Sequence, residues 1–273
     1  MQMSEEHIHS GDESMQDWGL PFYSQMTEWW GSLYISDEDR QRADQIERHC
    51  GSGAKVVLEL GAGCGGTAAA TAAIGHHVVA VEICPARAGI LREHAAQAAR
   101  GFLHPIEGDF YQVNFDQRFD VVCYWNGFGI GSDADQRRLL RRISAEWLVD
   151  GGSVLMNVFN PAWWIRRSGD TERKTRRLTQ GFDFDPVGSR FVDSWWPHGK
   201  PELAVAESIR CYAPVDLALL LEGTGLQLKR IEYDDGAAGS VQDDPIGAKE
   251  PLVGSWKYFV SLNHVVQPNT VAG

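Results

Sequence analysis

The residues with the clearest chemical meaning form a glycine-rich segment at positions 55–66. A short apolar run in this segment ends in a carboxylate, Glu59. Four glycines follow it: Gly61, Gly63, Gly65 and Gly66. Glycine allows a tight turn and lets a ligand approach the backbone closely, and the start of a helix offers free N–H groups. An alanine-rich run comes next, so the pattern predicts a strand, a ligand-binding turn and a helix that hold a nucleotide-type cofactor.

Two further acidic residues come at the ends of the next two apolar runs. Glu82 falls in the run 78–83, where a carboxylate can bind two ribose hydroxyls. Asp109 follows the run 102–107 and stands beside Phe110. An acid and an aromatic ring at this place could bind the amino group and the ring face of an adenine. The acids at successive strand ends therefore predict contacts along one extended ligand.

Glu59 separates two interpretations of the glycine spacing. Gly61-x-Gly63-x-x-Gly66 also fits a dinucleotide fingerprint, which by itself is weak evidence. A carboxylate two residues before the first glycine could bind a cationic amino group, directly or through water. The same carboxylate would be an unusual neighbour for a pyrophosphate. A cofactor that carries an amino group is therefore favoured over a nicotinamide dinucleotide.

Together these residues resemble the class I S-adenosylmethionine-dependent methyltransferases. The family's glycine motif appears as Glu59-Leu-Gly61-Ala-Gly63-Cys-Gly65, and its fourth-strand segment as 119–126. The resemblance covers roughly residues 37–161, with a looser match over 205–265. It implies S-adenosylmethionine as cofactor, with S-adenosylhomocysteine as product and no metal. The cofactor contacts that it implies are Glu59, Gly61, Ala62, Gly63, Gly65, Glu82, Ile83, Asp109, Phe110, Tyr124, Trp125 and Asn126.

The elements that must position these residues alternate between strand and helix patterns. Strands are predicted at 56–60, 78–83, 102–107, 119–125 and 153–159. Helices are predicted at 37–50, with Asp37 as N-cap, at 67–74, at 85–100, and from 132. Such alternation predicts an α/β fold with a parallel sheet covered on both faces. With the resemblance, we expect a Rossmann-like, doubly wound, mostly parallel seven-stranded sheet with an antiparallel last strand.

The remaining segments suggest six parts of the chain. We expect a disordered tail at 1–16, an aromatic lid helix at 17–36, the cofactor-binding core at 37–161, a β-rich substrate-side insertion after the fifth strand at 162–212, the C-terminal part of the core at 213–265, and a tail at 266–273. Within the insertion, 182–196 and 203–212 are predicted to be two strands joined by a turn at 197–201. A helix from Pro214, strands at 226–233 and 256–265, and a loop at 234–255 complete the prediction.

The catalytic group is harder to predict from residue types. Methyl transfer from a sulfonium is an in-line displacement, in which the enzyme chiefly aligns the nucleophile and excludes water. A base is needed only for a hydroxyl, an acidic carbon or a protonated amine. Candidate bases are His198, Tyr212 and His104, although a lone histidine is more often structural.

Several aromatic residues and one arginine are candidates for the substrate-binding wall. They are Tyr23, Trp29, Trp30, Tyr34, Trp163, Trp195 and Arg210. Core packing is the alternative for each tryptophan pair. The basic stretch 166–177 is either a solvated face or an entrance for an anionic substrate. The substrate is therefore expected to be a small molecule, with an aromatic or an anionic one as options.

Composition excludes several classes of partner. The net charge of −12 over 273 residues disfavours nucleic acid and anionic membranes. No apolar run approaches the roughly 18 residues that span a bilayer, and the acidic start is unlike a signal peptide. The five scattered cysteines suit a reducing cytosol, which predicts a cytoplasmic protein. No spacing of metal ligands is present, and the oligomeric state stays open.

We therefore predict an enzyme that transfers a methyl group from S-adenosylmethionine to a nitrogen, oxygen or carbon of a small molecule. The arginine-, alanine- and glycine-rich composition suggests a high-GC bacterium, and a role in secondary metabolism is a separate expectation. One alternative is an NAD(P)-dependent oxidoreductase, and another is a protein of this fold that binds the cofactor but does not methylate, for example a cyclase. Protein or nucleic-acid methylation is disfavoured by the acidic charge and because Asn126-Gly-Phe-Gly stands after the fourth strand in place of an Asn/Asp-Pro-Pro-aromatic motif.

Overall fold

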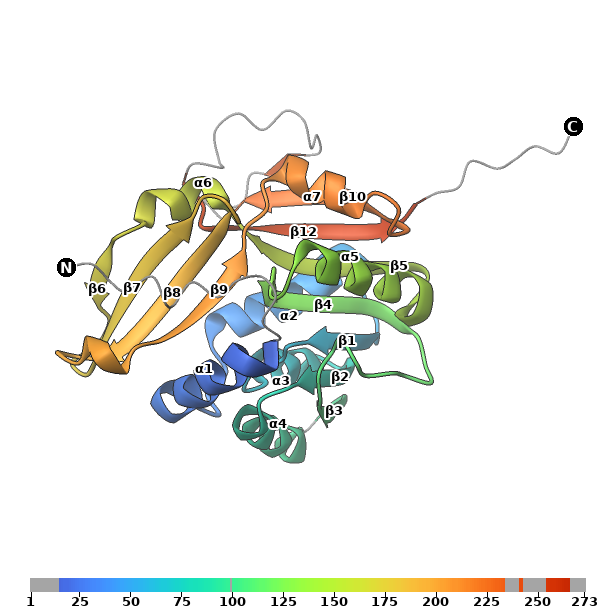
Figure 1. Ribbon diagram of the computed structural model, residues 1–273. Helices are drawn as coiled ribbons and strands as arrows, with labels where there is room; N and C mark the ends of the chain where they lie inside the picture. Colours follow the sequence, from blue (N-terminus) through green and yellow to red (C-terminus); the bar gives the residue numbers. More distant parts are fainter. Residues whose placement is uncertain (1–14, 99, 234–240, 243–253, 266–273) are drawn as a thin grey trace, which may run out of the picture.

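The strands of the protein form two β-sheets (Figure 1). The computed structural model describes residues 15–98, 100–233, 241–242 and 254–265. Across these residues the larger sheet has the strand order β11-β10-β12-β5-β4-β1-β2-β3. The expected tails fall largely outside the described residues, as does most of the loop predicted at 234–255. Residues 15 and 16, placed in the N-terminal tail by the sequence, already belong to the first helix.

The larger sheet confirms the predicted fold. Its parallel strands are β1 (Val56–Leu60), β2 (His77–Glu82), β3 (Phe102–Glu107), β4 (Phe119–Phe128) and β5 (Leu148–Phe159). The antiparallel last strand, β12 (Lys257–His264), lies between β5 and β10 (Leu226–Tyr233). A two-residue strand, β11 (Val241–Gln242), pairs with β10 and adds an eighth member to the expected seven.

Successive strand residues supply two separate hydrophobic cores, one on each face of this sheet. Leu58 belongs to the core that also contains residues of α5 (Asp133–Arg142) and α7 (Pro214–Leu221). Val57 belongs to the opposite core, with residues of α2 (Asp37–Cys50), α3 (Gly66–Ala73) and α4 (Pro85–Gln97). A π-helical turn, Ile143–Trp147, extends α5. Both faces are thus buried, which explains the near-continuous apolar runs.

Local capping sets where α2 begins. Ser36, and not the predicted Asp37, is the N-cap residue, and its hydroxyl accepts from the Asp39 N–H at 3.1 Å. The Asp39 carboxylate in turn accepts from the Ser36 N–H at 2.9 Å. This reciprocal pair is a capping box, which outweighs an aspartate one position later.

A second, antiparallel sheet follows β5. It contains β6 (Thr171–Arg173), β7 (Leu178–Asp185), β8 (Arg190–Pro197) and β9 (Val205–Arg210) in that order. The short helix α6 (Pro161–Trp164) and a 3₁₀ turn, Ile165–Arg167, lead into it, and a second 3₁₀ turn, Pro201–Leu203, precedes β9. The single strand expected at 182–196 was wrong, because β7 and β8 form a hairpin there. Pro186 and Gly188 lie in its turn, and both residue types favour turns.

The helix α1 (Met15–Trp30) contacts both β9 and α4, so it bridges the second sheet and the main domain (Figure 1). Phe22 on this helix is buried with Leu178 and Trp195 of the second sheet. Among the described residues, no helix combines the length and the apolarity needed to cross a bilayer.

Candidate active site

The glycine-rich turn joins β1 to α3 and is attached to the end of β2. The Ala62 N–H donates to the Val81 carbonyl at 2.9 Å. The Gly63 N–H donates to one Glu82 carboxylate oxygen at 2.8 Å, and the Cys84 N–H donates to the other at 2.9 Å. Glu82 is thereby fixed at the end of β2, and each oxygen keeps lone pairs that could accept from ligand hydroxyls.

Two glycines of this turn are required for different reasons. A Cβ on Gly61, whose φ is +63°, would lie 3.6 Å from the ring of Tyr124 and 3.8 Å from that of Phe110. A Cβ on Gly65, whose φ is +87°, would lie 2.4 Å from the Leu91 side chain of α4. Gly61 is therefore favoured by its positive φ, which side chains rarely adopt, whereas the lack of a side chain at Gly65 allows α3 to pack against α4.

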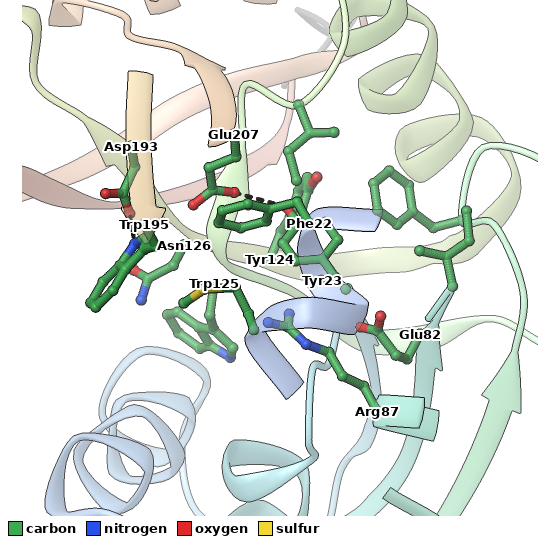
Figure 2. A pocket seen from close by; sticks show the side chains of 16 residues that line it. Phe22, Tyr23, Glu82, Arg87, Tyr124, Trp125, Asn126, Asp193, Trp195 and Glu207 are labelled. Carbon is green, nitrogen blue, oxygen red and sulfur yellow. Dashed lines mark hydrogen bonds between the residues drawn. The ribbon is translucent and has the colours of Figure 1, made fainter. Parts of the chain in front are cut away.

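A cavity of about 240 Å³ lies between this turn, α1 and the second sheet (Figure 2). The predicted cofactor residues in its wall are Gly61, Glu82, Ile83, Phe110, Tyr124, Trp125 and Asn126. Tyr23 and Trp195, predicted as substrate contacts, also line it. Wall residues that the sequence did not predict are Phe22, Met26, Arg87, Gly127, Ile130, Asp193 and Glu207. The cavity therefore joins cofactor-type residues of the main domain to side chains of α1, β8 and β9.

Two buried polar groups in this wall lack a partner. Tyr124 is 1% exposed and Trp125 6%, yet the Tyr124 hydroxyl and the Trp125 indole N–H have no hydrogen-bond partner among the described residues. An unsatisfied buried group costs about 1–3 kcal/mol. A ligand with polar groups could satisfy both. The neighbouring Asn126 has a positive φ of 53°, which is uncommon for a residue other than glycine.

Two carboxyl groups reach the cavity from the second sheet. Asp193 of β8 and Glu207 of β9 are direct cross-strand partners. Glu207 accepts a hydrogen bond from the Tyr23 hydroxyl at 3.0 Å (Figure 2). Asp193 accepts from the Gln180 amide at 2.8 Å and from the Trp195 indole at 2.9 Å. Two ionised carboxylates in this position are costly unless one of them keeps a proton or a cation binds to them.

Burial shifts the titration of both carboxyls. It raises the pKa of Glu207 to about 8, and the nearby charge of Asp193 adds to that rise. Burial also raises the pKa of Asp193 to about 6. Both side chains are half-buried, because part of each faces the cavity. Arg87 of α4 lies on the other side of Tyr23, with its guanidinium 4.5 Å from that ring.

The segment that carries the glycine turn is similar to a known protein family. Residues 57–152, which hold the glycine turn, Glu82 and β4, match the Methyltransferase domain family. The chain carries a class I S-adenosylmethionine-dependent methyltransferase domain. The resemblance drawn from the sequence is thus confirmed, and S-adenosylmethionine is the cofactor.

Three individual proteins are similar to this methyltransferase. The cypemycin N-terminal methyltransferase of a Streptomyces species is 26% identical over 203 residues, which cover 71% of this chain and 79% of that protein. The CcbJ methyltransferase from Streptomyces caelestis has a TM-score of 0.71 at 21% identity and covers 94% of this chain and 100% of its own. CalS10, an amino pentose methyltransferase from Micromonospora echinaspora, has a TM-score of 0.55 at 17% identity and covers 93% and 99%. The two solved structures show a shared fold.

The residues that line the cavity of this methyltransferase have the chemistry to bind such a cofactor. Its Glu82 carboxylate could bind ribose hydroxyls, Phe110 could contact the adenine, and the unpartnered Tyr124 hydroxyl offers a polar contact. When bound, S-adenosylmethionine supplies a methyl group that its sulfonium activates for displacement. No cluster of three His, Cys, Asp or Glu side chains suited to a metal occurs among the residues that the structure describes.

Glu59 and Asp109 lie outside the cavity wall formed by the described residues. Glu59 is 3% exposed, and burial raises its pKa to about 8. Asp109 accepts a hydrogen bond from the Tyr111 N–H at 2.8 Å, which is the contact of an ordinary turn. Their assignment to the cofactor, like that of Ala62, Gly63 and Gly65, stays a prediction.

The three candidate bases lie away from the described cavity wall. His198 is exposed in the turn after β8, with its Nδ1 3.3 Å from the Thr179 hydroxyl. His104 is exposed on β3, at the edge of the main sheet. Tyr212 is buried, but its hydroxyl donates to the Asp133 carboxylate at 2.7 Å. We therefore do not retain them as bases in the methyltransferase.

The other predicted substrate residues divide between a second cavity and structural positions. Trp30 lines a more open cavity of about 390 Å³, where its ring meets that of Trp195 edge-on at 5.7 Å. Trp29 packs against the cluster of Phe22, Leu178 and Trp195. The remaining three, Tyr34, Trp163 and Arg210, lie outside both described cavity walls. Tyr34 is 72% exposed. Trp163 packs against Trp164, and Arg210 pairs with Asp133 at 3.1 Å.

Proposed function

We propose that this methyltransferase transfers the methyl group to the amine nitrogen of a small molecule. One observation carries the proposal: the pair Asp193 and Glu207 faces the strand ends and the glycine turn across a single cavity. Methyl transfer requires the acceptor atom to lie in line with the donor. An amine bound to this pair would lie on the side of the cavity opposite the cofactor residues.

The charge of the cavity supports a cationic acceptor. In the described wall, the carboxyl groups of Glu82, Asp193 and Glu207 oppose one guanidinium, that of Arg87. In the basic stretch that the sequence offered as an anion entrance, Arg167 pairs with Asp170 at 2.7 Å, and Lys174, which lines the more open cavity, pairs with Glu172 at 2.7 Å. An anionic substrate is therefore disfavoured.

The printed names of the relatives point in the same direction. One relative methylates an N-terminus and another is an amino pentose methyltransferase. CalS10 is described as involved in calicheamicin biosynthesis, which supports a role for this chain in natural-product biosynthesis. We accordingly place the acceptor among peptides with a free N-terminus and amino sugars.

The acceptor atom is tested with methyl-labelled S-adenosylmethionine. The purified chain is incubated with a panel of short peptides and amino sugars, each matched by a hydroxyl analogue. We expect label on nitrogen in the amine members and none in their partners. Label that appears only on oxygen or carbon would contradict the proposal.

A binding measurement separates this function from the oxidoreductase alternative, and the panel assay separates it from the cyclase. S-adenosylhomocysteine at 100 times its Kd should stabilise the fold by about 2.7 kcal/mol, and NAD at the same concentration should not. A protein that binds the cofactor but catalyses cyclisation would show the same stabilisation, and would leave the methyl label on the donor in the panel assay.

A further inference from the structure

Resting on the proposed function, we propose that Glu207 is the catalytic proton acceptor for the amine and that Tyr23 is the residue that positions it. The geometry of the cavity distinguishes Glu207 from its neighbour. Both oxygens of Asp193 already accept from side chains of its own sheet, Gln180 and Trp195. Within the described chain, Tyr23 is the hydrogen-bond donor to Glu207 and contacts Oε2, which leaves Oε1 for a ligand (Figure 2).

An independent feature indicates that the cavity lined by Glu207 is built for a ligand. Tyr124 lines the same cavity from β4, is 1% exposed, and has a hydroxyl without a partner among the described residues. Such a group persists in a folded protein when something else satisfies it. The cavity into which Glu207 reaches thus offers two groups to its ligands, Oε1 of Glu207 and the hydroxyl of Tyr124.

The titratable and charged groups that act on Glu207 come from three elements. Tyr23 approaches from α1, Arg87 from α4 and Asp193 from β8. Burial and the charge of Asp193 raise the pKa of Glu207 to about 8, whereas the Tyr23 hydrogen bond and Arg87 oppose the rise. A general base works best when its pKa lies near the working pH. Glu207 meets this condition better than an exposed carboxylate, whose pKa is about 4.3.

Proton transfer precedes methyl transfer. A protonated amine has no free lone pair, so one N–H proton first passes to the Glu207 carboxylate. The nitrogen then attacks the methyl carbon, a C–N bond forms, and the C–S bond breaks with its electron pair on sulfur. The product is a methylammonium and a neutral thioether, and Glu207 afterwards releases its proton to water.

The first test needs no knowledge of the acceptor. Sinefungin carries a protonated amine where S-adenosylmethionine carries its methyl sulfonium, so its ammonium should lie beside Glu207. Calorimetry gives the Kd of sinefungin and of S-adenosylhomocysteine for the wild type and for Glu207→Gln. We expect the wild type to prefer sinefungin and the variant to lose about tenfold of that preference, as for one hydrogen bond to a charged group.

The pH dependence sharpens this test. The wild-type preference should increase from pH 6.5 to 8.5 as Glu207 ionises, and the preference of Glu207→Gln should stay flat. Glu202→Gln is the matched control, because Glu202 is exposed in the 3₁₀ turn that precedes β9. An equal preference in wild type and Glu207→Gln would overturn the inference. Failure of the wild type to bind either compound would instead overturn the proposed function.

Turnover gives a second readout with the amine methylated fastest in the panel. At pH 7, Glu207→Gln should lose about 10²- to 10⁴-fold in kcat/KM. Near pH 10 it should approach the wild type, because solvent then deprotonates the amine. Tyr23→Phe should shift the acid limb of the profile while activity is retained, as expected for a positioning residue. A uniform loss at every pH in Glu207→Gln would reject the base and leave only a binding role.

Discussion

At the scale of single residues, burial makes the ionisation of three carboxyl groups in or near the site unfavourable. Glu59, Asp193 and Glu207 all have a pKa raised chiefly by burial. Two of them line the cavity, whereas Glu59 lies below the glycine turn with the charges of Arg42 and Asp39 close by. A buried carboxylate lowers stability unless a cation compensates it. These groups are therefore expected to influence both the fold and the site.

Glu59→Gln should stabilise the protein without ligand at alkaline pH. The folded pKa of about 8 lies above the ordinary 4.5, so between these values the folded chain keeps a proton that the unfolded chain has lost. Stability therefore decreases as pH rises through this window, by at most about 1.4 kcal/mol per pH unit. Urea unfolding at pH 5.5 and 8 should show that the variant's advantage grows by about 3 kcal/mol. Glu93→Gln, at an exposed position of α4, is the control. Parallel pH profiles for wild type and Glu59→Gln would contradict this explanation.

At the scale of elements, α1 determines how much of the site is open. The inner cavity of about 240 Å³ is smaller than the roughly 300–1,000 Å³ of typical small-molecule sites. Met26, Arg87 and Trp195 line both this cavity and the open one of about 390 Å³. Movement of Met26 with α1 would merge the two into one space for cofactor and acceptor. We therefore propose that α1 acts as a lid.

Hydrogen exchange should detect the lid. Amides of α1 should exchange more slowly when sinefungin is bound, because Phe22, Tyr23 and Met26 then close on a ligand. Tyr23→Phe removes the bond to Glu207 and should speed exchange in the ligand-free protein. Helix α5, on the opposite side of the main sheet, provides the internal reference. Equal protection of α1 with and without ligand would show a fixed cap.

At the scale of the whole molecule, the site exists because the two sheets are held together. The ring centroid of Phe159, at the end of β5, lies 4.7 Å from that of Phe191 in β8. The Trp164 ring stacks on Phe191 with 4.2 Å between the ring centroids. The Trp164 indole also donates to the Trp256 carbonyl at 3.0 Å. This aromatic contact fixes β8 and β9 relative to the main sheet. Asp193 and Glu207 keep their place over the cofactor residues as a result.

Trp164→Ala should therefore damage both stability and the site. Loss of a buried tryptophan costs about 3–5 kcal/mol, and the sinefungin preference should fall with it. Trp163→Ala, at the neighbouring half-buried position, should cost clearly less. Chemical denaturation and calorimetry measure the two effects. Comparable losses in both variants would mean that the contact between the sheets does not depend on Trp164.

The sequence predicted the main sheet because its signals are local. The glycine turn, the apolar runs and the acid at the end of β2 lie within short segments, and parallel strands bring their carboxyl ends to one edge. Gly61, Glu82, Phe110 and Tyr124 consequently meet at one cavity. The two-strand prediction for the insertion failed where Pro186 and Gly188 divide a run into a hairpin.

Only the tertiary structure could identify the acceptor side of the site. Asp193 and Glu207 are 14 positions apart and become neighbours through the register of β8 and β9. Tyr23 reaches them from a helix 184 positions earlier than Glu207. The candidate bases were predicted by residue type alone. His198 lies in the turn after β8, His104 lies on the edge strand β3, and the Tyr212 hydroxyl donates to Asp133, so none of them lines the described cavity. The sequence thus determined the cofactor and its turn through local patterns. The packing of α1 and the second sheet on the main domain decided which carboxyls meet the cofactor, because burial and pairing depend on contacts between distant segments.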